Sequence, residues 1–370
     1  MLKRFEVENF KGFKDKLSFD LSAREYAFNR ELVQNGIVNK AIVYGKNGIG
    51  KSSLGIALFD IISHLTDKER MDRKYLRNYV NLDSDSNMVL FRYVFQFGTD
   101  EVIYEYIKAN YDYLVGEILT INGVCAIKYF YLLEDENLRY INQDIIKGLN
   151  IDLPDNKLSV IKYIYRNTPT NTVPAITQLV NFCENMLWYR SLSDGNTYAG
   201  FTNGGSTLAE TIYQHGNLED FTEFLRENGL KYNLVFDEED GKHVLKAVFG
   251  DGKKVPFESV ASTGTRALFL FYSWSVEAFK KVSLLFIDEF DAFFHYESAD
   301  AIVKKLNKGT HFQTILTTHN TYLMQNSLTR PDCCFLMTDN KIANLYDSTD
   351  REIREAHNLE KMYINGAFTA

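Results

Sequence analysis

The stretch "AIVYGKNGIGKSS", residues 41–53, decides how the rest of the chain is expected to fold. It runs from a short apolar segment into a glycine-rich loop and ends in a lysine and two serines. Residues 45–52 match the pattern G-x-x-x-x-G-K-[ST] without a mismatch. The run "KAIVY" predicts a buried strand before the loop, and "SLGIALFDIISHL" predicts an amphipathic helix after it. A strand, a glycine loop and a helix in this order are the context in which the pattern binds phosphate.

This loop, residues 45–52, is called the P-loop below. Its glycines let backbone N–H groups turn inward onto phosphates, and the N-terminus of the following helix adds positive potential. The residues expected to bind ATP are Gly45, Asn47, Gly48, Gly50, Lys51, Ser52 and Ser53. We expect Lys51 to reach the β- and γ-phosphates, Ser52 to hold Mg²⁺, and Lys51 to be solvated without ligand. The alternative is a tight turn with an incidental lysine.

A second motif, "VSLLFIDEFDAFFH", residues 282–295, begins as a hydrophobic strand and continues into two adjacent acids. A carboxylate at the C-terminal end of a strand beside a P-loop can reach the shell of Mg²⁺, and we assign this role to Asp288. The next acid, Glu289, can orient or polarise the attacking water. The alternative is a strand that ends in solvated acids.

The composition is that of an ordinary globular protein, with 45% hydrophobic and 24% charged residues. The net charge of −8 is unfavourable for a protein that coats DNA with its whole surface. No run of 18 apolar residues and no signal-peptide pattern occurs, and the four cysteines form no C-x-x-C pair. We therefore expect a reduced, cytoplasmic protein with no membrane partner.

The order of these motifs resembles that of the ABC-type ATPase heads of SMC, RecF and OLD-family proteins. More specifically, it is similar to the AAA15/AAA21 group of bacterial ABC-like ATPases. "LKRFEVENFKGFKDKLSFDL" resembles the opening strand pair of that group, and "FDAFFH" resembles the D-loop region. "ESVASTGTRALFLF" resembles the ABC signature, although it departs from LSGGQ at the leucine, the first glycine and the glutamine. "TILTTHN" ends in His319, which matches the H-loop histidine.

The resemblance implies a homodimer that buries two ATP molecules between its heads. Ser262 and the N–H of Gly264 would then bind the γ-phosphate held by the other subunit, and His319 would take part in catalysis. The residues "STG" can equally be an ordinary helix N-cap, and His319 can be a satisfied histidine at a strand end. For the Q-loop glutamine, Gln96 and Gln178 are both candidates.

The expected fold is α/β: a P-loop NTPase of the ABC-ATPase head type, with an antiparallel β subdomain and a helical lobe. Residues 1–135 are expected to form the first lobe with the P-loop, and 136–258 a helical and β insertion. Residues 259–370 are expected to form the signature helix and the second lobe. "KYNLVF" and "HVLKAVF" predict a hairpin, and no sustained heptad pattern predicts a coiled coil.

The function that this resemblance favours is an ATP-hydrolysing switch that dimerises on ATP and regulates a separate effector in bacteriophage defence. The effector would be a nuclease or toxin encoded nearby. One alternative is a RecF-like ATPase of DNA repair or DNA sensing, and a transporter ATPase is a more distant one. Another is a self-contained ribonuclease that uses Arg351, Glu355 and His357, although Arg351 and Glu355 at i and i+4 are more simply a pair on a surface helix.

Overall fold

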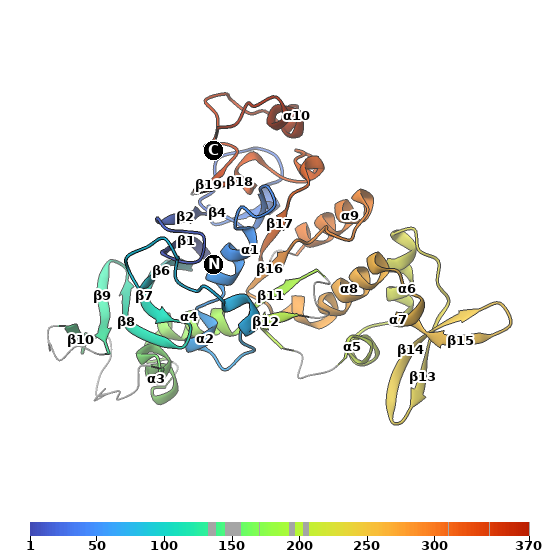
Figure 1. Ribbon diagram of the computed structural model, residues 1–370, viewed down its shortest axis with the longest axis horizontal. Helices are drawn as coiled ribbons and strands as arrows, with labels where there is room; N and C mark the ends of the chain where they lie inside the picture. Colours follow the sequence, from blue (N-terminus) through green and yellow to red (C-terminus); the bar gives the residue numbers. More distant parts are fainter. Residues whose placement is uncertain are drawn as a thin grey trace.

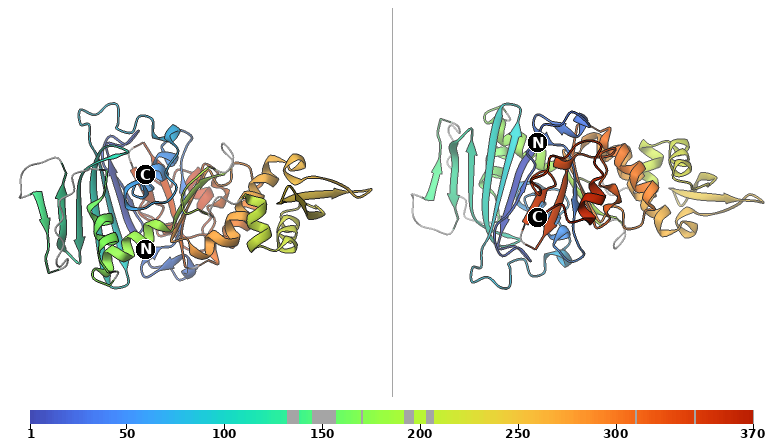
Figure 2. Two further views of the ribbon diagram at one scale, coloured as in Figure 1. Left: turned by 90° about the horizontal axis from the view of Figure 1, so that it is seen from below. Right: turned by 90° about the horizontal axis from the view of Figure 1, so that it is seen from above.

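The computed structural model describes residues 1–131, 138–144, 157–169, 171–191, 197–202, 207–309, 311–339 and 341–369. A central, mostly parallel sheet lies between an antiparallel sheet at one end of the molecule and a small helical and β lobe at the other (Figure 1). The two rotated views in Figure 2 show the same order of layers. This is the α/β head architecture that the sequence predicts.

The central sheet has seven strands, of which the middle five are parallel and the two at the edges are antiparallel to their neighbours. In spatial order they are β12 (Tyr198–Gly200), β11 (Met186–Arg190), β16 (Leu284–Asp288), β17 (Gln313–Thr318), β5 (Lys40–Tyr44), β18 (Cys334–Thr338) and β19 (Lys341–Asn344). Every residue of β5, β16 and β17 is buried. Continuous apolar strands are what a parallel sheet covered on both faces requires.

The two faces of the central sheet belong to two separate hydrophobic cores. Val43 and Phe286 face a core shared with α1 (Lys51–Leu58), α4 (Pro174–Glu184) and the antiparallel sheet. Their neighbours Tyr44 and Ile287 face the other core, which includes α8 (Thr263–Lys281), α9 (Tyr296–Asn307) and α6 (Leu218–Glu227). The strand period of two therefore assigns alternate residues to opposite cores.

The antiparallel sheet accounts for much of the aromatic content of the chain. Its strands in spatial order are β10 (Arg139–Ile141), β9 (Val124–Phe130), β8 (Tyr113–Ile121), β7 (Asp100–Asn110), β6 (Val89–Phe97), β1 (Leu2–Glu8) and β2 (Leu17–Asp20). On the inner face, the rings of Phe91 and Tyr106 stack at 4.8 Å, and those of Tyr93 and Phe95 at 5.9 Å. Aromatic pairs of this kind stabilise a sheet beyond their buried area.

The remaining elements are short. They are β3 (Val33–Gln34), β4 (Ile37–Val38), α2 (Ile62–Leu65), α3 (Val160–Asn167), α5 (Leu208–His215), β13 (Leu234–Glu239), β14 (Lys242–Phe249), β15 (Lys253–Pro256), α7 (Phe257–Val260) and α10 (Leu359–Ile364). Antiparallel β13 and β14 form the predicted hairpin. Within the described ranges, no helix is long and apolar enough to span a membrane.

Two features differ from the sequence-based expectation. The segment 136–258 contributes strands β11 and β12 to the central sheet, so it is more than an insertion beside that sheet. The expected boundary at 135/136 lies outside the described residues. The prediction of a surface helix carrying Arg351 and Glu355 is wrong, because residues 350–358 form no helix. A single charge pair contributes only a few tenths of a kcal/mol and cannot nucleate a helix without an apolar face.

A buried polar cluster joins α1 to the antiparallel sheet. Asp60 lies just beyond the end of α1 and is 1% exposed. Its Oδ1 pairs with Lys108 Nζ at 2.7 Å and accepts a hydrogen bond from Tyr106 at 3.0 Å, and its Oδ2 accepts one from Tyr79 at 2.8 Å. Burial lowers the pKa of Lys108, and the charge of Asp60 opposes that shift. The cluster fixes the end of the P-loop helix against strands β6 and β7.

Lys40, the first residue of β5, is also buried, and it offers a test of the central sheet. Its Nζ donates to Phe312 O at 2.8 Å and to Thr314 Oγ1 at 3.1 Å. Burial lowers the pKa of Lys40 to about 7. Between pH 7 and about 10.4 the unfolded chain then binds more protons than the folded chain, so this residue makes the free energy of unfolding rise with pH.

We predict that Lys40→Met abolishes this dependence. In wild type, Lys40 should raise the free energy of unfolding by up to about 2.5 kcal/mol between pH 7 and pH 9, and the variant should lack this rise. Urea unfolding of both proteins at several pH values measures this difference. Lys242→Met, which replaces an exposed lysine at the start of β14, is the control and should run parallel to wild type. Parallel curves for Lys40→Met would contradict the prediction.

Candidate nucleotide site

The P-loop joins the end of β5 to the start of α1, as the sequence predicts. Gly48 and Gly50 adopt positive φ angles of 78° and 109°, which side-chain-bearing residues rarely adopt. A Cβ on Gly50 would lie 2.8 Å from the ring of Phe13, whereas nothing lies within 4 Å of one on Gly48. Asn47 and Gly48 are exposed, and Gly45, Ser52 and Ser53 are partly buried. The loop therefore packs tightly at its base and is open at its tip.

Lys51 is placed differently from expectation. It is 6% exposed rather than solvated, and it is the first residue of α1. Its Nζ donates to Gly45 O at 2.7 Å and to Lys46 O at 2.9 Å, so the loop closes around its own lysine. Burial lowers the pKa of Lys51, and the nearby charges of Asp288 and Glu289 oppose that shift. The lysine head thus lies between the loop carbonyls and the two acids of the second motif.

Asp288 ends β16 and is fully buried. Its Oδ1 accepts a hydrogen bond from Thr317 Oγ1 at 2.7 Å, and its Oδ2 has no hydrogen-bond partner. Burial raises the pKa of Asp288, and hydrogen bonds from Thr317 and Ser52 lower it. Ser52 and Asp288, 236 positions apart (288 − 52), are therefore in contact.

Glu289 is held in an unusual backbone conformation. Its φ is +49°, in the left-handed region, which costs a non-glycine residue about 1–2 kcal/mol. Its N–H donates to Thr317 Oγ1 at 2.8 Å, so one threonine hydroxyl positions both adjacent acids. Its carboxylate pairs with Arg190 Nη2 at 2.6 Å. Backbone strain of this kind is found where a fold must aim a functional side chain.

A third acid, Asp291, completes this edge of the sheet. It is 6% exposed, and its Oδ2 accepts a hydrogen bond from Thr318 Oγ1 at 2.9 Å, while its Oδ1 has no hydrogen-bond partner. Burial raises the pKa of Asp291, and the charges of His319 and Lys51 act against that rise. His319 is exposed and directly follows β17. It thus lies within electrostatic range of Asp291, as Lys51 does.

The predicted signature residues lie at the start of α8. Ser262 is the exposed N-cap, and its Oγ accepts a hydrogen bond from Thr265 N at 3.2 Å. A Cβ on Gly264 would lie 2.8 Å from Phe293 O, near the end of the second motif. This close approach requires glycine and joins the signature to the D-loop region.

The other candidates are not brought to this edge. Gln96 donates to Gly98 O at the end of β6, and Gln178 is exposed on α4. Arg351, Glu355 and His357 are exposed in an irregular segment. The two Q-loop candidates therefore gain no support from their positions.

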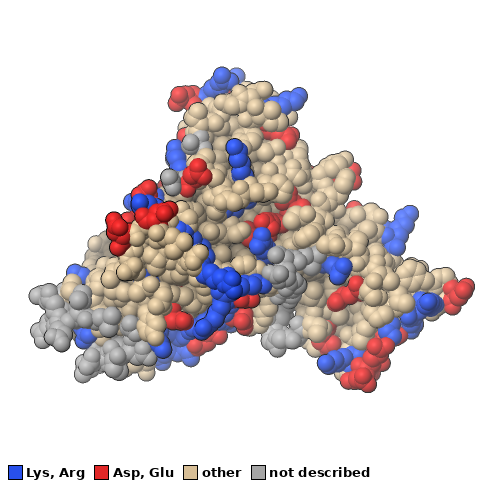
Figure 3. All heavy atoms as spheres, viewed as in Figure 1, with Lys and Arg blue, Asp and Glu red and all other residues tan. Residues whose placement is uncertain are grey.

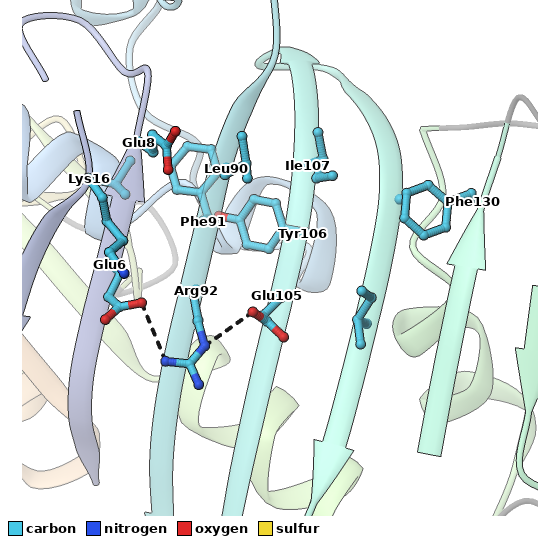
Figure 4. Close-up of a pocket in the computed structure, with 13 residues that line it drawn as sticks. Glu6, Glu8, Lys16, Leu90, Phe91, Arg92, Glu105, Tyr106, Ile107 and Phe130 are labelled. Atoms are coloured by element: carbon cyan, nitrogen blue, oxygen red, sulfur yellow. Dashed lines mark hydrogen bonds and ion pairs between the residues drawn. The ribbon is translucent and has the colours of Figure 1, made fainter. Parts of the chain in front are cut away.

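A separate hollow of about 290 Å³ lies on the outer face of the antiparallel sheet (Figure 4). Arg92 is one of its lining residues and lies between Glu6, at 3.4 Å, and Glu105, at 3.2 Å. None of the P-loop residues or the acids of the second motif lines this hollow. The candidate nucleotide site is therefore distinct from it.

The residues present fit a magnesium ion. Mg²⁺ prefers oxygen ligands and is usually bound by one or two carboxylates together with phosphate oxygens and water. Asp288 supplies a buried carboxylate oxygen without a hydrogen-bond partner, and Ser52 supplies a hydroxyl in contact with the same carboxylate. These two residues would hold the ion.

A glycine loop between a buried strand and a helix, with two acids at the end of another parallel strand of the same sheet, defines a P-loop NTPase. The family model described as "AAA domain, putative AbiEii toxin, Type IV TA system" matches residues 40–325, which is more than half of the chain. The chain belongs to this family. The resemblance to ABC-type ATPase heads is confirmed at the level of this family.

Among solved structures, the chain is similar to SMC heads. One is the SMC head domain from Thermotoga maritima, with 14% identity, a TM-score of 0.40 and coverage of 93% of this chain and 98% of that one. Another is the Smc head domain with an extended coiled coil, bound to the C-terminal domain of ScpA derived from Pyrococcus furiosus, with 12% identity, a TM-score of 0.48 and coverage of 94% and 97%. A third is an SmcHead bound to the C-winged helix domain of ScpA, with 14% identity, a TM-score of 0.45 and coverage of 92% and 96%.

These identities are too low to assign a role to any residue of this chain. A comparison with curated proteins gives no match.

Sequence reasoning missed three residues of the site: Arg190, Thr317 and Asp291. Asp291 and Thr317 lie inside segments that the sequence did single out, "FDAFFH" and "TILTTHN". Arg190 follows the apolar run "MLWY", and an arginine directly after a buried strand was the available signal. Its partner, however, depends on which strand lies beside β11.

We predict that Lys51→Ala weakens ATP binding at least a hundredfold, because the loop loses the one lysine that faces both the phosphate cradle and the acids. Titration of a fluorescent ATP analogue measures the affinity. Lys46→Ala, which removes an exposed lysine of the same loop, is the matched control and should bind within a few-fold of wild type. Because Lys51 also bonds two loop carbonyls, thermal unfolding should accompany the titration. Equal affinity of folded Lys51→Ala and wild type would refute the assignment.

Proposed function

We propose that this chain is an ATP-hydrolysing switch that dimerises on ATP and regulates a separate effector in bacteriophage defence. The observation that carries the proposal is the contact of the Ser52 hydroxyl with buried Asp288, beside Lys51 and Glu289. A P-loop serine, a buried acid and a following acid are the parts that phosphoryl transfer to water requires.

Each part has one task in the reaction. Lys51 leaves the carbonyls of Gly45 and Lys46 and pairs with the β- and γ-phosphates, while backbone N–H groups of the loop bind phosphate oxygens. Ser52 and Asp288 would hold Mg²⁺, which would neutralise the charge that develops on the phosphates. Glu289 orients the attacking water and accepts its proton.

The start of α8 supports a site completed by a second subunit. Ser262 is exposed, and its hydrogen bond lies within its own helix, so the N–H groups of this helix end can receive an anion from outside the chain. Gly264 approaches Phe293 O, so the signature and the loop after Glu289 form one continuous surface. His319 would contact the γ-phosphate from the end of β17. ATP bound between two such surfaces would couple hydrolysis to dimer opening.

The effector role rests on two further points. The family description names a putative toxin of a toxin–antitoxin system, which supports a role in defence. Arg351, Glu355 and His357 lie exposed in an irregular segment, and the Nδ1 of His357 accepts a hydrogen bond from Arg354 N at 3.2 Å. That arrangement counts against a ribonuclease site on this chain and favours effector chemistry supplied by a partner.

A RecF-like role in DNA repair or sensing is the second candidate. Between α2 and β6, Arg70, Arg73, Lys74 and Arg77 are all exposed, and Lys and Arg side chains gather over this segment (Figure 3). A basic surface of this kind favours contact with phosphate backbones. Acids at Asp67, Glu69 and Asp72 in the same segment reduce its charge, so the effector role is preferred.

We predict that Glu289→Gln keeps ATP binding and loses at least 99% of turnover, because the amide preserves the shape and removes the basic oxygen. The variant should also accumulate as the ATP-bound dimer. Phosphate release and size-exclusion chromatography with ATP measure the two effects. Hydrolysis at the wild-type rate would show that another group activates the water.

We predict that Ser262→Arg blocks closure of the dimer, because a bulky cation fills the space where the other subunit approaches. Nucleotide binding should survive, since Lys51 and Ser52 lie in the other lobe. Loss of the N-cap costs about 1 kcal/mol, so folding is checked by thermal unfolding.

Mixing Ser262→Arg with Lys51→Ala creates heterodimers with one intact site, built from the P-loop of the first chain and the signature of the second. Partial recovery of ATPase activity, absent from either variant alone, is the expected result if one working site suffices. Full activity of the Ser262→Arg homodimer would refute the signature assignment.

A further inference from the structure

Arg190 is a basic side chain beside Asp288 and Glu289 that sequence reasoning did not select. It ends β11, and the parallel register places it directly beside Asp288 on β16. Its Nη2 lies 2.6 Å and its Nε 3.2 Å from the same Glu289 oxygen, Oε2. The Tyr75 side chain also hydrogen-bonds to it. The Arg190 side chain is 22% exposed and that of Glu289 is 39% exposed, so this contact is partly open to water.

This contact occupies one of the two carboxylate oxygens of Glu289, the predicted water-activating residue. A carboxylate oxygen that already accepts two guanidinium hydrogen bonds is a weaker acceptor for a proton from water. The backbone of Glu289 is fixed by Thr317, so the side chain alone must turn to release Arg190. In this arrangement the acid is therefore held in a resting position.

The same guanidinium also approaches the magnesium ligand. Arg190 Nε lies 3.6 Å from Asp288 Oδ2, which is the oxygen left without a hydrogen bond. The other oxygen of Asp288 is taken by Thr317. A divalent cation bound by Asp288 Oδ2 and Ser52 would repel a guanidinium at this distance, and the low exposure of both side chains limits screening by salt.

We propose that Arg190 is a positioning residue that latches Glu289 at rest and is displaced when Mg²⁺ and nucleotide bind. The proposal rests on the proposed function, since it concerns the same two acids. Backbone pairing of β11 with β16 already joins the two strands, so the side-chain contact is not needed to hold the sheet together. The latch prevents activation of water before the substrate is in place.

The test compares Arg190→Gln with wild type in two measurements. The first is the Mg²⁺ concentration that half-saturates binding of a slowly hydrolysed ATP analogue. It should fall at least fivefold, because the competing charge is gone. The second is the steady-state kinetics of ATP hydrolysis, in which kcat/KM should rise severalfold while kcat stays within about twofold of wild type. Arg190→Lys keeps a positive charge and should need nearly as much Mg²⁺ as wild type.

The matched control is Arg4→Gln, which removes an arginine paired with Asp20 at 2.6 Å in the antiparallel sheet. It should leave both measurements unchanged. If Arg190→Gln does not fold, Tyr75→Phe loosens the same guanidinium without touching either acid, and it should lower the Mg²⁺ requirement by about twofold.

Weaker binding of the Mg²⁺–nucleotide complex by Arg190→Gln would overturn the latch and make Arg190 a phosphate ligand instead. An unchanged Mg²⁺ requirement and an unchanged kcat/KM would also overturn it. In both cases the proposed function survives, because wild type still binds and hydrolyses ATP. A wild-type protein that binds no nucleotide would overturn the latch and the proposed function together.

Discussion

The parallel register of four buried strands is the constraint on which the candidate site depends. In the register of the sheet, Arg190 lies opposite Asp288, Ile287 opposite Leu316, and Thr318 opposite Tyr44. The C-terminal ends of β11, β16, β17 and β5 therefore lie at one edge. Adjacent strands lie about 4.8 Å apart, within reach of one side chain from its neighbour. A slip of one residue in β16 would turn Asp288 to the other face of the sheet. It would also exchange the residues of β16 that face the two hydrophobic cores. The apolar packing on both faces of the sheet therefore also fixes the chemistry.

Several side chains of the site have partners within the chain, whereas Asp288 Oδ2 and Asp291 Oδ1 have no hydrogen-bond partner. Lys51 is bound by loop carbonyls, Glu289 by Arg190, and one oxygen of Asp288 by Thr317. Burial raises the pKa of Asp288, which means that its carboxylate gains from any cation that approaches. Binding of a magnesium nucleotide would exchange these internal contacts for stronger ones to phosphate and metal.

The sequence predicted the parts of the site that depend on local order. The P-loop and the strand ending at Asp288 are continuous motifs whose apolar flanks identify them. Arg190 and Thr317 could not be assigned, because their roles depend on which strands are neighbours, and that order does not follow the chain. The burial of Lys51 was missed because a loop carbonyl can replace water as the partner of an ammonium group.

The rest of the fold shows the same contrast between features set by local sequence, which could be predicted, and features set by long-range pairing, which could not. The hairpin of β13 and β14 was predictable, because its turn and both strands are contiguous in the chain. Placement of β11 in the central sheet was not, because its partner β16 begins about a hundred residues later. The roles of Ser262 and Gly264 depend on a second subunit, and these roles and that of His319 remain predictions.

The buried pair of Asp60 and Lys108 limits which substitutions this sequence can accept during evolution. Losing either partner alone leaves an uncompensated charge in the core, at a cost of about 3–5 kcal/mol, whereas replacing both by apolar residues can be nearly neutral. The tyrosines that bind Asp60 would have to change with them, since their hydroxyls would lose an acceptor. Among relatives, these positions should therefore be inherited or abandoned as a set, and homologues that keep one charge without the other should be rare.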